Sequence, residues 1–112
     1  MAANEITATE AIALMTGDRA VLLDVREPDE WDRGHSVVAT SVPMSQLQER
    51  IAEVPDDRPL LVVCHSGHRS AMVSSALVDA GYDATNVIGG MVAWKAAGGQ
   101  LVAVGAAEPT VD

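Results

Sequence analysis

Short apolar runs alternate along this chain with segments that carry small and apolar residues at helical spacing. The runs are rich in valine and leucine and are bounded by proline, glycine and charged residues, which is typical of short buried strands. We expect strands over 20–26, 36–43, 60–64 and 85–88. Strands that alternate with helices require βαβ crossovers, so this order predicts an α/β fold with a mainly parallel central sheet and helices on both faces.

Capping signals mark where the helices should begin. Thr7 and Glu10 have the spacing of a capping box, and Ser45 and Gln48 repeat it. Pro28 suits the first turn of a short helix that ends near Gly34. We therefore expect helices over 7–17, 28–34, 45–54, 69–80 and 91–98, with Trp31 and Trp94 in the core.

The size and charge of the chain restrict its possible functions. A chain of 112 residues holds one core, and its tail, 105–112, is small and polar-ended and is expected to be frayed. A net charge of -9 argues against nucleic acid or an anionic membrane as the main partner, and favours a monomer or a weak dimer.

The cellular compartment is the next expectation. A single cysteine cannot form an internal disulfide, and the N-terminal segment lacks the basic region of a signal peptide. The apolar runs are also too short to cross a bilayer. We expect a cytoplasmic protein.

The lone cysteine, Cys64, lies in the segment VVCHSGHRSAM, after the most strand-like run in the chain. The next helix begins about five residues later, so 64–69 forms a loop at the carboxyl edge of the sheet. Backbone amides at a helix N-terminus bind anions, and Gly67 allows the positive φ that a tight loop requires. A thiol in this position ionises more readily than a free one.

Arg69 supports an anion at this loop. A cation in the first turn of a helix opposes the helix dipole, and its placement is explained if an anion normally binds there. No Asp or Glu occurs between Asp57 and Asp79, although the chain holds 16 acidic residues. The loop is therefore a non-acidic stretch of an acidic protein.

These residues also have other interpretations. Cys64 could be a small buried hydrophobic residue, and His65 and His68 could be solvated loop residues. A metal bound by all three is disfavoured, because no second cysteine completes a closed site. Asp24 and Arg26 end an earlier strand and should face the same edge as Cys64.

The stretches LLDVREPDEWDRGH, CHSGHRSA, ALVDAGY and NVIGGMVAWKAAG, in this order and spacing, resemble the single-domain rhodaneses, a family of sulfurtransferases. The resemblance implies one rhodanese-like domain of three layers over 1–112, with its core at about 6–99. It also implies that Cys64 is the nucleophile and carries a sulfane sulfur as a persulfide. The donor would be thiosulfate or a protein persulfide, and the acceptor a thiol or cyanide, without a cofactor or a metal.

The same resemblance assigns further residues. The loop amides of His65, Ser66, Gly67, His68 and Arg69 would surround the sulfur. Asp24 and Arg26 would help to orient the loop, and His35 would connect one loop to the next. For Asp24 and Arg26, a local ion pair with Glu27 or Glu30 is an equally good reading.

Three other functions are alternatives. Cysteine phosphatases have five residues between cysteine and arginine, whereas this chain has four between Cys64 and Arg69, a smaller ring that suits sulfur better than phosphate. An arsenate reductase that relays thiols needs a second cysteine. A non-catalytic binding module would need neither Cys64 nor Arg69.

Two departures from the family affect the site. Residues 36–43 read SVVATSVP where relatives have a segment similar to IPGAINIP. Many relatives also have arginine where this chain has His65. We expect weaker use of thiosulfate than in those relatives, improving below about pH 6.5 as free histidine becomes protonated.

Overall fold

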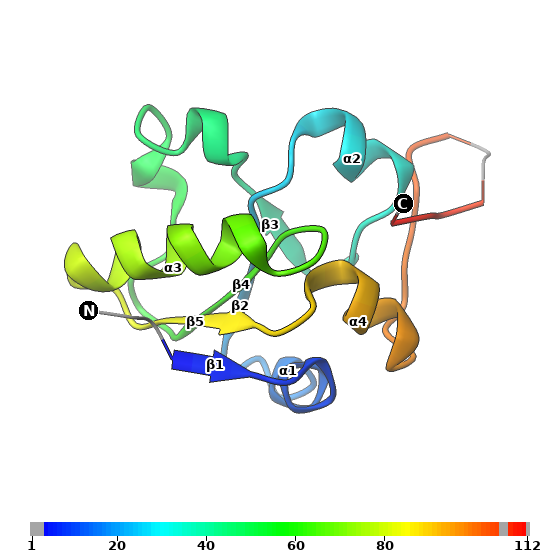
Figure 1. Cartoon of the computed structure of the whole chain (residues 1–112), viewed down its shortest axis with the longest axis horizontal. Helices are drawn as coiled ribbons and strands as arrows, with labels where there is room; N and C mark the ends of the chain where they lie inside the picture. The colour runs from blue at the N-terminus through cyan, green and yellow to red at the C-terminus, as the bar shows by residue number, and fades with distance from the viewer. Residues whose placement is uncertain (1–3, 106–107, 112) are drawn as a thin grey trace.

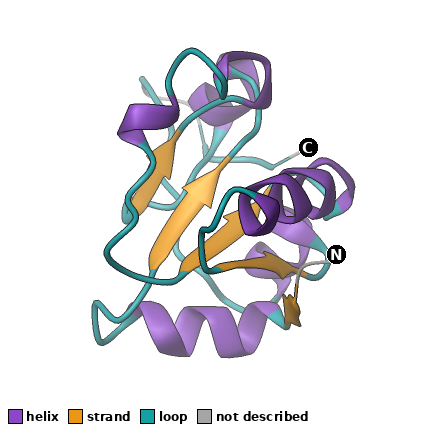
Figure 2. Ribbon diagram, turned by 90° about the vertical axis from the view of Figure 1, so that its left-hand side faces the viewer, coloured by secondary structure: helices purple, strands orange, loops and turns teal. Residues whose placement is uncertain are grey.

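The computed structural model describes residues 4–105 and 108–111. Five parallel strands form one sheet in the order β1-β5-β4-β2-β3, so the α/β prediction is confirmed (Figures 1 and 2). The strands are β1 (Asn4–Ile6), β2 (Val21–Asp24), β3 (Ala39–Ser41), β4 (Leu60–Val63) and β5 (Ala84–Val87). The helices are α1 (Ala8–Met15), α2 (Pro28–Arg33), α3 (His68–Asp79) and α4 (Gly90–Ala96), with short 3-10 turns η1 (Met44–Gln46) and η2 (Ile51–Glu53).

Alternate residues of the central strands point to opposite faces of the sheet. Both faces are covered. Leu23 and Val62 face a cluster that includes residues of α3. Leu22 and Leu61 face a second cluster that includes Trp94 and residues of α1 and α4. The two central strands are buried at every position, as expected of a parallel sheet between two helical layers.

Strand β1 is not expected from the sequence. Asn4–Ile6 is only three residues long, with two exposed positions, and pairs in parallel with the edge of β5. The following capping box forms as expected, with Thr7 as N-cap of α1 and Glu10 bonding back to it.

The prediction of a helix over 45–54 is wrong. This stretch forms only η1 and η2. The Ser45 hydroxyl, expected to cap the helix, instead donates to Glu27 Oε1 at 2.6 Å. The guanidinium of Arg50 is held by Glu53 and by the carbonyl of Ser41. These contacts replace the capping box and fix the segment as two turns.

The strand expected over 36–43 is shorter than predicted. Val37 and Val38 lie in an exposed turn, in which the Ala39 amide donates to the Ser36 carbonyl. Trp94 is buried as expected, but Trp31 is only half-buried. Its indole ring instead stacks on the imidazole of His35, with centroids 3.7 Å apart.

Of the expected frayed tail, 105–112, Gly105 is exposed, whereas the segment 108–111 is held by contacts of Thr110 and Val111. It runs beside α2 (Figure 1), where the Thr110 amide donates to the Arg33 carbonyl. The Val111 side chain is 4% exposed and joins the cluster beneath α1 and α4. The remainder of the expected frayed tail, 106–107 and 112, lies outside the described residues.

Candidate active site

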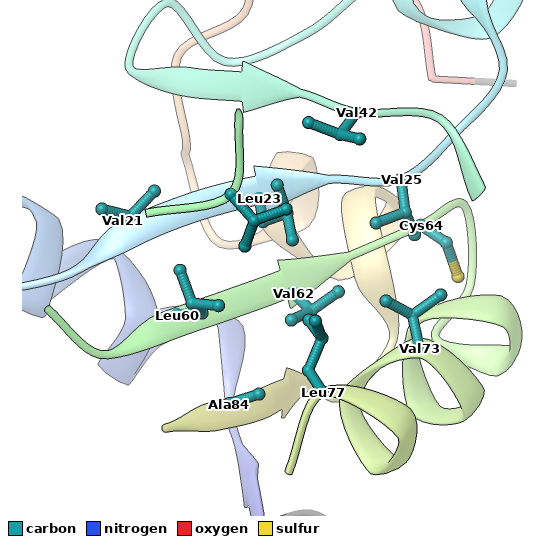
Figure 3. Packing of buried hydrophobic residues seen from close by; sticks show 11 residues of the cluster. Val21, Leu23, Val25, Val42, Leu60, Val62, Cys64, Val73, Leu77 and Ala84 are labelled. Carbon is teal, nitrogen blue, oxygen red and sulfur yellow. The ribbon is translucent and has the colours of Figure 1, made fainter. Parts of the chain in front are cut away.

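Cys64 directly follows β4, and its side chain is 1% exposed. Its sulfur points toward the beginning of α3 (Figure 3). Gly67, the N-cap of that helix, has a φ of 102°, and a Cβ on it would lie 3.1 Å from the Gly89 nitrogen. The predicted loop at a helix N-terminus is therefore present, with glycine at the position that needs it.

Two donors approach the sulfur of Cys64. The Gly67 amide lies 3.1 Å from Sγ, and the Ser70 hydroxyl lies 3.3 Å from it. Burial alone would raise the pKa of the thiol. The Ser70 hydroxyl and the backbone amides of Ser70, Gly67 and Ser66 stabilise the thiolate and lower the pKa of Cys64 below its ordinary value.

The beginning of α4 closes the loop from the other side. The Met91 amide donates to the Cys64 carbonyl at 2.8 Å, and the Val92 amide donates to the His65 carbonyl at 3.1 Å. A Cβ on Gly90 would collide with both carbonyl groups. The loop is thus held between the first turns of α3 and α4, and glycine is required where the backbones meet.

Arg69 was expected to face an anion, but its side chain is paired with Glu30. The guanidinium makes two bonds to this carboxylate, of 2.7 and 2.8 Å. This arginine holds the pKa of Glu30 at about 2. Glu30 was missed as a partner, because it lies on α2, 39 residues away in sequence.

Asp24 and Arg26 pair with each other and are both buried. Arg26 also donates to the carbonyl oxygens of Gly34 and Glu30, at 2.7 and 3.3 Å. The predicted local ion pair with Glu27 or Glu30 is therefore wrong, because Asp24 and Arg26 pair with each other. The buried pair thus holds α2, the helix that presents Glu30 to Arg69, at Glu30 and at its C-cap Gly34.

The three histidines occupy different surroundings. The His65 imidazole bonds through Nδ1 to the Val111 carbonyl at 2.7 Å, so it contacts the C-terminal segment. His68 and its neighbour Ser66 are exposed, and His68 is the first residue of α3. His35 Nδ1 lies 2.7 Å from the Trp31 carbonyl, and its backbone bridges to Val102.

Asn86 on β5 was not singled out from the sequence. Its Oδ1 accepts from the Ser70 hydroxyl at 2.6 Å, and its Nδ2 lies 3.4 Å from the Gly67 carbonyl. Asn86 therefore contacts both residues that donate to the sulfur. The signal that could have indicated Asn86 is a polar residue near the end of a predicted strand, because the carboxyl ends of parallel strands share one edge.

No group of three or more histidine, cysteine or acidic side chains could hold a metal ion in 4–105 and 108–111. Within the same residues no helix is long and apolar enough to span a membrane.

The fold and the loop define a small α/β protein that holds a cysteine among backbone amides at a helix N-terminus. The profile of the rhodanese-like domain matches residues 7–97, and the chain belongs to this family.

Three comparisons illustrate the relationship. The chain is 33% identical over 93 residues to thiosulfate sulfurtransferase GlpE of Coxiella burnetii, covering 82% of this chain and 87% of the relative. It is 40% identical over 84 residues to the probable adenylyltransferase/sulfurtransferase MoeZ of Mycobacterium tuberculosis, covering 72% of this chain but only 21% of that protein. The crystal structure of a rhodanese-related protein from Thermoplasma volcanium matches with a TM-score of 0.82 and 29% identity, covering 88% of this chain and 97% of that one.

Proposed function

We propose that this protein is a sulfurtransferase that carries a sulfane sulfur as a persulfide on Cys64. The observation that carries the proposal is the hydrogen bonding of the Cys64 sulfur by the Gly67 amide and the Ser70 hydroxyl. These contacts lower the pKa of the thiol despite its burial, which favours the nucleophilic thiolate. Family membership and relatives named as sulfurtransferases support the same chemistry.

The first half-reaction loads the cysteine. The Cys64 thiolate attacks the sulfane sulfur of the donor, forming a new S–S bond while the donor's own bond to that sulfur breaks. The leaving group departs with the electron pair, as sulfite from thiosulfate or as a thiolate from a persulfide. The amides of the 65–69 loop stabilise the negative charge as it moves to the outer sulfur.

The second half-reaction unloads it. A thiolate or cyanide acceptor attacks the outer sulfur and releases the Cys64 thiolate, giving an acceptor persulfide or thiocyanate. Because the sulfur is held covalently between the two steps, the kinetics should be ping-pong. The cycle needs no cofactor and no metal, and it requires a reduced thiol, which suits the cytoplasm.

Intact mass spectrometry tests the proposal. The reduced protein is incubated with thiosulfate or with cysteine hydropersulfide and then with cyanide. We expect a gain of one sulfur atom that cyanide reverses and that is absent in Cys64→Ser. If neither donor adds sulfur to the folded protein, the proposal is wrong.

Two observations favour a second candidate. The 1% exposure of Cys64 and the pairing of Arg69 with Glu30 are also compatible with a rhodanese-like module that binds a partner without turnover. The mass experiment separates the two, because a binding module would gain no sulfur.

A further inference from the structure

The ion pair between Arg69 and Glu30 lies beside the cysteine loop. Arg69 is in the first turn of α3, and Glu30 comes from α2. The two bonds, of 2.7 and 2.8 Å, form a bidentate pair, the strongest geometry available to an arginine and a carboxylate. The side chains are 32% and 20% exposed, so water screens the pair only in part.

Glu30 is held in place independently of Arg69. Its carboxylate accepts from the Glu27 amide at 3.1 Å in the capping box of α2, and Arg26 donates to its backbone carbonyl. The carboxylate is thus positioned before any substrate arrives. With a pKa of about 2, it stays ionised at every pH at which a sulfurtransferase would work.

Two of the other basic side chains around the loop are also engaged, whereas His68 is exposed. Arg26 is buried against Asp24, and the His65 imidazole bonds to the Val111 carbonyl. The loop therefore offers an incoming anion its backbone amides, but the charge of Arg69 is balanced by Glu30.

We propose that Glu30 is a specificity-determining residue: by holding Arg69 in a bidentate ion pair, it disfavours dianionic donors such as thiosulfate and leaves persulfides of low net charge as the preferred donors. The assignment rests on the proposed sulfurtransferase function. A dianion must either displace Glu30 from Arg69 or bind beside the glutamate charge, and both routes weaken its binding. A zwitterionic donor such as cysteine hydropersulfide meets a much smaller penalty.

The first test compares the loading of Cys64 by the two donors. In Glu30→Gln, Arg69 keeps a hydrogen-bond acceptor but regains its net charge, so the half-saturating thiosulfate concentration should fall about tenfold, as expected for one uncompensated charge. Loading by cysteine hydropersulfide should change less than about twofold, and the ratio of the two donors corrects for any change in thiolate fraction.

Asp29→Asn is the matched control. It removes the same charge from the same helix, but Asp29 is exposed and pairs at 3.5 Å with Arg33 instead of Arg69. The ratio of the donors should stay at the wild-type value. A Glu30→Gln protein that is folded and retains the wild-type ratio would overturn the assignment.

A second readout does not require sulfur transfer. Iodoacetate is anionic and iodoacetamide neutral, so the ratio of their alkylation rates at Cys64 reports the charge facing the sulfur. The rate with iodoacetate relative to iodoacetamide should rise at least about fivefold in Glu30→Gln. It should fall in Arg69→Gln, which leaves the charge of Glu30 uncompensated. If neither donor loads Cys64 but these ratios move as stated, the proposed function fails while the electrostatic role of Glu30 stands. Unchanged ratios in both variants would refute that role.

Discussion

The Ser70 hydroxyl lies 2.6 Å from Asn86 Oδ1 and 3.3 Å from Cys64 Sγ, so its one proton has two acceptors. The amide oxygen is the nearer acceptor while Cys64 is a neutral thiol. Ionisation of the sulfur creates a charged acceptor, which strengthens the second bond. The Ser70 hydroxyl therefore has an acceptor for its proton whether Cys64 is a thiol or a thiolate.

Ser70→Ala should raise the pKa of Cys64, because it removes a donor to the thiolate while the cost of burial remains. A hydrogen bond to a charged group contributes about 1.5–3 kcal/mol, so the rise should be readily measurable. The pH dependence of alkylation by iodoacetamide measures it. Ser75→Ala on the same helix should leave the pKa at its wild-type value. An identical pKa in the wild type and Ser70→Ala would contradict the assigned hydrogen bond.

Gly67→Ala tests the loop backbone, with Gly81→Ala as its control. Both glycines have positive φ, of 102° and 97°, so each substitution should cost about 1 kcal/mol of backbone strain. Only at position 67 would the new Cβ also press on the Gly89 nitrogen, whereas nothing lies within 4 Å at position 81. Urea unfolding should show the larger loss for Gly67→Ala, accompanied by slower alkylation of Cys64. Equal losses in the two variants would rule out the contact with Gly89.

The Glu30–Arg69 pair predicts an acid-dependent part of the stability. The pKa of Glu30 is about 2 in the folded state and 4.5 as the ordinary value. The stabilisation is therefore complete above pH 4.5 and is lost as the pH falls toward 2. After solvent screening we expect about 1–2 kcal/mol from this pair.

The free energy of unfolding of the wild type and Glu30→Gln, measured by urea between pH 2 and 7, checks this. The difference between the two proteins should be largest near neutral pH and shrink with acidification. A difference that is constant over the whole range would show that the pair contributes nothing through ionisation.

Val111→Ala tests the packing of the C-terminal segment. This side chain is 4% exposed, and its backbone carbonyl binds His65, so shortening it should destabilise the protein by about 1–2 kcal/mol. Val104→Ala, at a position 62% exposed, should cost less than about 0.5 kcal/mol. Thermal unfolding of the two variants compares them. Equal melting temperatures for both would mean that the segment is not packed in solution.

Local sequence by itself determined the frame of the fold and the location of the loop. The runs at 20–26 and 60–64 are apolar enough to be buried strands in any arrangement, and the alternation with helices leaves a parallel sheet as the consistent solution. Cys64, Gly67 and the start of α3 are close in sequence, so their spacing alone predicts a cysteine at a helix N-terminus. These residues are only a few positions apart in the chain, so tertiary contacts change their relative positions little.

Tertiary structure decided the partners of that loop. Glu30 and Arg69 are separated by 39 residues, and Ser70 and Asn86 by 16, so only the packing of α2 and β5 around α3 brings each pair together. The same holds for Val111, and for Ser45, whose hydroxyl bonds to Glu27 in preference to capping a helix. The sequence thus supplies the nucleophile and its amides, whereas the charge that surrounds them depends on which distant side chains the sheet order places beside the loop.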